Sequence, residues 1–221
     1  MIRGLLFDFD GLLVDTEAAA FRAWTEVFAE HGHEFDVDRW LANVGTVGRR
    51  YDPLDHLAEL TDGTFDRERL DERRLERELE LAHAEELRAG VAEYLEEAAE
   101  RDLAVAIVSS ASERWVRSHL ERLGIDHVWA CLTCADHDRA RAKPAPVLYL
   151  EALEKLDLAP EEAIAFEDSL NGVRAAKAAG LVCVAVPNSV TASLALDEAD
   201  FVVDSLEDVP LDRLLADVES R

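Results

Sequence analysis

The chain has 221 residues, which is enough for one sizeable hydrophobic core, or for one core and a small second unit. Hydrophobic residues make up 49% of it, yet no apolar segment approaches the roughly 20 residues that a membrane span needs. Acidic residues begin at Asp8, so the first residues do not resemble a secretory signal peptide. We therefore expect a soluble cytoplasmic protein with no membrane partner.

The net charge of −25 is far outside the range of roughly 2–8 that is typical of a small soluble domain. The only lysines are Lys143, Lys155 and Lys177, and arginine supplies the remaining cations. A folded protein this acidic repels itself at low salt, whereas ~1 M salt shortens the screening length to about 3 Å. We therefore hypothesise a salt-rich, halophilic cytoplasm. Nucleic acid is not an expected partner, because no basic stripe is present to neutralise phosphates.

Five apolar segments have the length of strands, and they span residues 2–7, 103–108, 128–132, 163–166 and 181–186. A sixth, at residues 201–203, is short. They are near-continuous rather than alternating, which is typical of strands buried on both faces. Helical patterns lie between most of them. Ser112 and Pro146 can begin two of these helices, and Asp168 or Ser169 can cap a third. The alternation predicts an α/β fold with a doubly wound parallel sheet.

The segment from Asp15 to about Glu85 breaks this alternation, because it contains helical patterns and no convincing strand. Within it, Asp52 and Pro53 form a good helix start, with an N-cap residue followed by proline at the first helical position. We therefore predict two units. Residues 1–14 and 86–221 form the α/β catalytic core, and residues 15–85 form a small helical cap inserted after the first strand.

Polar side chains gather where the predicted strands end, which is where ligands bind in open α/β sheets. They are Asp8 and Asp10 after strand one, Ser109 and Ser110 after strand two, Lys143 after strand three, and Glu167 and Asp168 after strand four. Four uncompensated carboxylates would repel one another strongly. Mg²⁺ prefers oxygen ligands and often joins carboxylates to a phosphate, so this edge predicts a magnesium site. Gly11 follows Asp10 and permits a tight turn that brings backbone amides near a phosphate.

Four segments in chain order, DFDGLLVDTE, IVSSAS, KPAP and FEDSLNGVRAAKAAG, resemble the four motifs of the haloacid dehalogenase superfamily. The branch they resemble contains β-phosphoglucomutase and small sugar-phosphate phosphatases. The resemblance covers nearly the whole chain. It implies a Rossmann-like core, and the predicted helical insert lies where that branch carries its cap.

The resemblance also implies roles for matching residues. Asp8 would be the nucleophile that forms an aspartyl-phosphate, and Asp10 would act as general acid and then as general base. Ser109, Ser110 and Lys143 would bind the phosphoryl group. These roles agree with the chemistry, because a carboxylate attacking a phosphate ester meets like charge and needs cations nearby.

The implied metal site consists of the carboxylates of Asp8 and Asp168 and the backbone carbonyl of Asp10, with support from Glu167. Dehalogenation is an alternative within the superfamily, but it requires neither magnesium nor these additional acidic groups. We therefore expect a Mg²⁺-dependent phosphatase for a small phosphorylated metabolite such as a sugar phosphate.

The choice between phosphatase and mutase depends on the cap. The mutase pattern has a histidine just before Phe21, where this chain has Ala20, and a basic or amide-bearing segment where this chain has residues 111–113. These differences favour hydrolysis over a β-phosphoglucomutase-like mutase. Arg49 and Arg50 are candidate substrate contacts, and a non-catalytic metabolite-binding protein is the alternative of another class. A monomer is the favoured oligomeric state.

Overall fold

The computed structural model describes residues 1–41 and 51–220, and its centre is a six-stranded sheet in which all neighbouring strands are parallel. The strands are β1 (Gly4–Phe7), β2 (Ala104–Ser109), β3 (Cys131–Cys134), β4 (Ala163–Glu167), β5 (Val182–Ala185) and β6 (Phe201–Val202). They lie in the order β3-β2-β1-β4-β5-β6. The predicted doubly wound parallel α/β fold is therefore confirmed.

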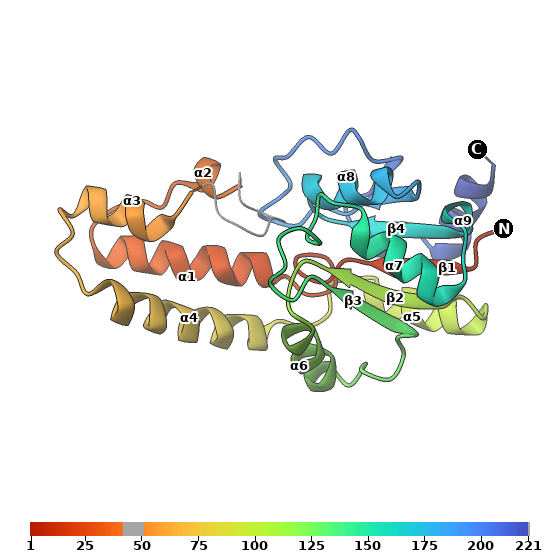
Figure 1. Cartoon of the computed structure of the whole chain (residues 1–221), viewed down its shortest axis with the longest axis horizontal. Coiled ribbons are helices and arrows are strands. Elements are labelled where there is room, and N and C mark those ends of the chain that lie inside the picture. Colours follow the sequence, from red (N-terminus) through yellow and green to blue (C-terminus); the bar gives the residue numbers. More distant parts are fainter. Residues whose placement is uncertain (42–50, 221) are drawn as a thin grey trace.

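Successive side chains of the central strands point to opposite faces of the sheet, as the strand repeat requires. Leu5 and Phe7 belong to one hydrophobic cluster, whereas Leu6 between them belongs to another. Helices lie on both faces of the sheet (Figure 1). Burial on both faces explains why these strands appear in the sequence as continuous apolar runs.

Five helices belong to the core: α5 (Val91–Glu100), α6 (Glu113–Leu123), α7 (Val147–Leu156), α8 (Leu170–Ala178) and α9 (Leu211–Glu219). Two short 3₁₀ helices, η1 (Pro160–Glu162) and η2 (Leu206–Asp208), lie in the connections. Helices α5, α6 and α9 supply buried residues to the cluster of Phe7, and α7 and α8 supply them to the cluster of Leu6. The sheet is thus the middle layer of three.

The remaining helices of the described chain are α1 (Thr16–Glu30), α2 (Val37–Leu41), α3 (Pro53–Leu60) and α4 (Arg67–Ala84). Figure 1 shows them extending away from the carboxyl ends of the central strands. Trp24, Phe28 and Leu57 are fully buried in a hydrophobic cluster formed mainly by these helices. They occupy the segment predicted to be the cap, while the exact division at residues 15 and 85 stays a prediction.

Two details differ from the sequence interpretation. Strand β3 begins at Cys131 rather than at residue 128, because Val128 and Trp129 pack on the core from an irregular segment, with Trp129 edge-on to Phe7. The cap of α8 is Ser169 and not Asp168. The Ser169 hydroxyl accepts a hydrogen bond from the amide of Gly172 at 3.1 Å, which leaves Asp168 free to point elsewhere.

No helix among the described residues has both the length and the apolar character of a membrane span.

Candidate active site

The ends of β1 and β4 bring three buried carboxylates together. Asp8 directly follows β1, and its amide continues the ladder by donating to the carbonyl of Phe166 at 3.0 Å. Glu167 ends β4 and Asp168 follows it. One carboxylate oxygen from each of Asp8, Glu167 and Asp168 lies within 4.8 Å of the others. Because β1 and β4 are parallel neighbours, residues from distant positions in the sequence lie in one cluster.

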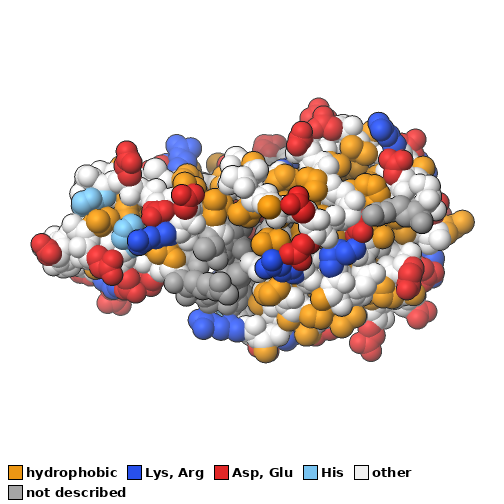
Figure 2. Space-filling view, turned by 90° about the horizontal axis from the view of Figure 1, so that it is seen from above, with side chains coloured by type: hydrophobic (Ala, Val, Ile, Leu, Met, Phe, Trp, Pro, Cys, Tyr) orange, Lys and Arg blue, Asp and Glu red, His pale blue; other side chains and the backbone are white. Residues whose placement is uncertain are grey.

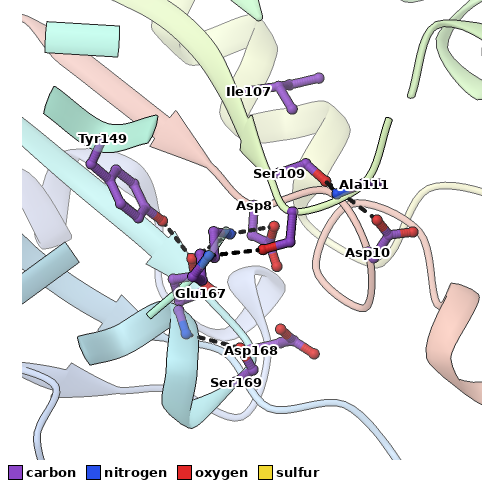
Figure 3. A network of polar contacts seen from close by, with 12 residues as sticks. Asp8, Asp10, Ile107, Ser109, Ala111, Tyr149, Glu167, Asp168 and Ser169 are labelled. Carbon is purple, nitrogen blue, oxygen red and sulfur yellow. Dashed lines mark hydrogen bonds and ion pairs between the residues drawn. The ribbon is translucent and has the colours of Figure 1, made fainter. Parts of the chain in front are cut away.

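Lys143 joins this cluster from the loop between β3 and α7. Its Nζ lies 2.5 Å from Asp8 Oδ1 and 2.6 Å from Glu167 Oε1. Tyr149 of α7 donates its hydroxyl to the same Glu167 oxygen at 2.5 Å, as Figure 3 shows. Burial by itself lowers the pKa of Lys143, but the charges of Asp8 and Glu167 outweigh it and raise that pKa. Lys143 is consequently a permanent cation between two carboxylates.

One lysine does not compensate this much negative charge. Burial, followed by the charge of Asp8, raises the pKa values of both Glu167 and Asp168. In addition, Glu167 Oε2 is buried without a hydrogen-bond partner. A hard divalent cation satisfies such a set of carboxylate oxygens, so the residues present fit Mg²⁺.

Asp10 does not contribute its carboxylate to this cluster. Its Oδ1 accepts hydrogen bonds from Thr16 Oγ1 and Trp115 Nε1, both at 2.8 Å, and Ser109 Oγ donates to Oδ2 at 3.4 Å. Figure 3 shows this carboxylate beside Ser109 and apart from Glu167. Burial and then the charge of Asp8 raise the pKa of Asp10 to about 6. Strand β1 ends at Phe7, so the strand alternation that would place the side chains of Asp8 and Asp10 on one face does not extend to Asp10.

The two serines after β2 have different contacts. Ser109 is fully buried, and its Oγ also accepts from the amide of Ala111 at 3.0 Å. Ser110 Oγ accepts from the backbone amide of Lys143 at 3.2 Å, so it holds the lysine loop against the end of β2. Their predicted role in binding a phosphoryl group stays a prediction.

Two glycines leave room for the site carboxylates. Gly11 has a φ of +81°, and a Cβ on it would lie 2.3 Å from Asp168 Oδ2. A Cβ on Gly172 would lie 1.7 Å from Glu167 Oε2. The amide of Gly11 donates to the carbonyl of Val14 at 2.8 Å. The glycine at position 11 is therefore required by its backbone angle and by the close approach of Asp168.

Several residues at the site were not singled out from the sequence. Trp115 and Thr16 hold Asp10, Tyr149 holds Glu167, and Asn188 holds Asp168. Thr16 lies within the first motif and could have been considered there. Trp115, Tyr149 and Asn188 have no local signal, because a single aromatic or amide residue is common in any helix or loop.

Glu17 at the start of α1 is a further half-buried carboxylate near the site. Burial, followed by the charge of Asp10, raises its pKa to about 8. His137, in the loop after β3, is exposed and adopts a positive φ. The predicted contacts Arg49 and Arg50 lie outside the described residues.

Comparison with known proteins places this site in a family. A family model of haloacid dehalogenase-like hydrolases matches residues 2–180. The chain is 37% identical over 221 residues to the "Putative phosphatase YhcW" of Bacillus subtilis (strain 168), and all of both chains is covered. It is 31% identical over 204 residues to the "Phosphorylated carbohydrates phosphatase" of Thermotoga maritima, which covers 91% of this chain and 93% of that protein.

A crystal structure of a "putative beta-phosphoglucomutase" from Thermotoga maritima is also similar. The TM-score is 0.79 at 28% sequence identity, with 97% of this chain and 99% of that chain covered. The match over most of the chain, together with the carboxylates and lysine at the strand ends, leaves little support for a non-catalytic binding protein. This chain belongs to the haloacid dehalogenase-like hydrolase family.

Proposed function

We propose that this hydrolase is a Mg²⁺-dependent phosphatase that acts on a small phosphorylated metabolite such as a sugar phosphate. The observation that carries this proposal is the cluster of Asp8, Glu167 and Asp168 at the strand ends, with Lys143 inserted between two of its members. A site with a buried carboxylate nucleophile, an adjacent fixed cation and further metal-ligating oxygens suits transfer of a phosphoryl group.

The carboxylates of Asp8 and Asp168, with the backbone carbonyl of Asp10 and support from Glu167, would hold the cation. Bound Mg²⁺ would reduce the repulsion between the nucleophile and the phosphate. Lys143 contributes positive charge at the same place. Its contact with Asp8 also holds one carboxylate oxygen at 2.5 Å, which orients the nucleophile.

The reaction then has two steps. An Asp8 oxygen forms a bond to phosphorus while the ester P–O bond breaks, and Asp10 gives its proton to the departing alkoxide. Water next attacks the aspartyl-phosphate, Asp10 takes the proton from that water, and the P–O bond to Asp8 breaks to release inorganic phosphate. Movement of the helical cap admits the substrate and excludes bulk water.

A test of the chemistry measures phosphate release from p-nitrophenyl phosphate with Mg²⁺ and with EDTA. We expect turnover only with Mg²⁺, and we expect Asp8→Asn to lower kcat by at least about a thousandfold. Asp126→Asn is the matched control, because its side chain is 56% exposed at the surface. Full turnover by Asp8→Asn, or by the wild type in EDTA, would overturn the proposal.

The substrate class is supported by the similarity to a phosphorylated-carbohydrate phosphatase. A mutase stays the second candidate, because the structure resembles that of the Thermotoga maritima β-phosphoglucomutase-like protein. Glucose 1-phosphate supplied with a trace of the bisphosphate separates the two candidates. We expect free phosphate to accumulate, whereas the appearance of glucose 6-phosphate without phosphate release would favour the mutase.

A further inference from the structure

The loop that follows β5 reaches the active site, although it lies beyond the residues 2–180 that match the family model. Asn188 in this loop is only 4% exposed. Its Nδ2 donates to Asp168 Oδ2 at 2.7 Å and to the carbonyl of Gly11 at 3.1 Å. One amide group thus contacts both a candidate metal ligand and the turn that follows β1.

The orientation of the Asn188 side-chain amide is determined by the contacts of its oxygen, Oδ1. Asn188 Oδ1 accepts hydrogen bonds from the backbone amides of Val190 and Thr191, each at 2.9 Å. An oxygen at that position is required, because two N–H groups point at it. The NH₂ group must therefore face Asp168 and Gly11, and both of its protons are used.

The loop itself is held from several directions. Thr191 is fully buried, and its Oγ1 accepts from the amide of Asn188 at 2.9 Å. Val190 packs in the hydrophobic cluster of the cap helices. The guanidinium of Arg88, where the chain returns from the cap, donates to the carbonyls of Val186 and Pro187 at 3.2 and 2.8 Å. Asn188 is consequently presented to Asp168 from a rigid support.

We propose that Asn188 is a positioning residue that holds the Asp168 carboxylate in the orientation needed to bind the divalent cation. This inference rests on the proposed function, since it assumes that Asp168 binds Mg²⁺. Asp168 lies among like charges and would otherwise rotate away from Asp8 and Glu167. The NH₂ group of Asn188, 2.7 Å from Asp168 Oδ2, opposes that rotation before the cation binds. The carboxylate of Asp168 is therefore already oriented, and cation binding does not have to order it.

The test compares Asn188→Ser with Thr191→Val in the full-length protein. A serine at position 188 can still accept from the amide two residues later, which preserves the turn, but it is too short to reach Asp168. The Gly11 carbonyl keeps its hydrogen bond from Arg88 at 2.6 Å. Thr191→Val removes one contact of the same loop, from the Asn188 backbone amide to the Thr191 hydroxyl. The two backbone amides that orient the Asn188 side chain remain, so its NH₂ group still faces Asp168.

Mg²⁺ binding is measured by titration calorimetry without substrate, and the melting temperature is measured in EDTA. We expect Asn188→Ser to weaken Mg²⁺ binding by about 10–100-fold, the usual effect of losing a group that orients a metal ligand. We expect Thr191→Val to lower the melting temperature in EDTA while its Mg²⁺ affinity stays within about twofold of the wild type.

Two results would overturn the inference. One is an Asn188→Ser protein with the affinity of the wild type, and the other is a Thr191→Val protein that loses as much affinity as Asn188→Ser. Both leave the proposed function intact, because the wild type still binds Mg²⁺ in those cases. A wild type that binds no Mg²⁺ would overturn the proposed metal dependence and this inference together.

Discussion

At the scale of single residues, Gly172 and Gly11 are required for different physical reasons. Gly172 lies in α8, where a side chain would occupy the space of the Glu167 carboxylate. Gly11 combines a positive φ with the close approach of Asp168 and Asn188. Two substitutions can therefore distinguish steric crowding from backbone strain.

Gly172→Ala should destabilise the protein by about 1–3 kcal/mol, the usual cost of overpacking a buried site. Helix propensity alone predicts the opposite, since alanine is better than glycine inside a helix by about 1 kcal/mol. Urea unfolding measures the change. Arg174→Ala in the exposed face of the same helix is the control and should stay within about 0.5 kcal/mol. A stabilised Gly172→Ala protein would contradict the crowding that the structure predicts.

Gly11→Ala should cost more than Gly124→Ala, although both residues have positive φ. Gly124 has a φ of +72° and open space around its Cβ position, so only the backbone cost of about 1–2 kcal/mol applies. At Gly11 the new Cβ also meets Asp168 Oδ2 at 2.3 Å and Asn188 Nδ2 at 2.6 Å. We expect a further loss of about 1–3 kcal/mol by urea unfolding. Equal losses at the two positions would show that Asp168 and Asn188 can move away from the new side chain at little cost, and would contradict this prediction.

At the scale of elements, the junction between α6 and α4 buries a histidine. His119 of α6 is fully buried and neither ring nitrogen has a hydrogen-bond partner in the described structure. Its ring lies edge-on to Trp115 and to His83 of α4, with centroids 4.4 and 5.0 Å apart. Burial, followed by the charges of His83 and Arg122, lowers the pKa of His119 to about 4.

This lowered pKa predicts a loss of stability in acid. Between the unfolded value near 6.5 and the folded value of about 4, the unfolded chain binds the proton and the folded chain does not. The contribution of His119 to stability therefore falls by about 2 kcal/mol between pH 7 and pH 5, whereas the raised pKa values of the buried carboxyls, such as Glu17, act in the opposite direction. Between pH 7 and pH 5, the change in unfolding free energy of His119→Leu, measured with urea, should therefore be more favourable than that of the wild type by about 2 kcal/mol. His127→Gln, at an exposed position, should show the same change as the wild type. An identical change in His119→Leu and in the wild type would refute this prediction.

Element prediction succeeded where the local pattern and the packing agree. Ser112 caps α6 and Asp52 caps α3, as their positions indicate. It failed at the start of β3. Val128 and Trp129 are as apolar as the residues of a buried strand, but they pack against the core from an irregular segment that precedes β3. An apolar sequence indicates that a segment is buried. Whether the buried segment is a strand depends on its backbone hydrogen bonds to a neighbouring strand, which the local sequence does not specify.

At the scale of the whole molecule, the charge of −25 is the dominant property. Figure 2 shows acidic side chains spread over both the cap helices and the core on that face, rather than gathered in one patch. Distributed charge of one sign opposes compaction at low ionic strength and is screened by salt. The salt-rich environment stays a prediction that follows from this balance.

We expect the melting temperature to rise by at least ~5 °C between 0.1 M and 2 M KCl, which corresponds to a gain of about 2 kcal/mol. The double variant Glu72→Gln and Glu76→Gln removes two exposed charges from α4. It should melt higher than the wild type at 0.1 M KCl and depend less on salt. A melting temperature independent of KCl would rule out repulsion as a major factor in stability.

The sequence by itself determined the alternating strands and helices and the residues at the strand ends. The carboxyl ends of parallel strands lie at one edge of the sheet, so the sequence alone predicts that Asp8, Lys143 and Asp168 meet there. Only the tertiary structure decided how these residues are held. Asn188 and Gly11 are 177 positions apart, and the donors of Asp10 come from both α1 and α6. Such contacts depend on how whole elements pack, and no local pattern of residues encodes that packing.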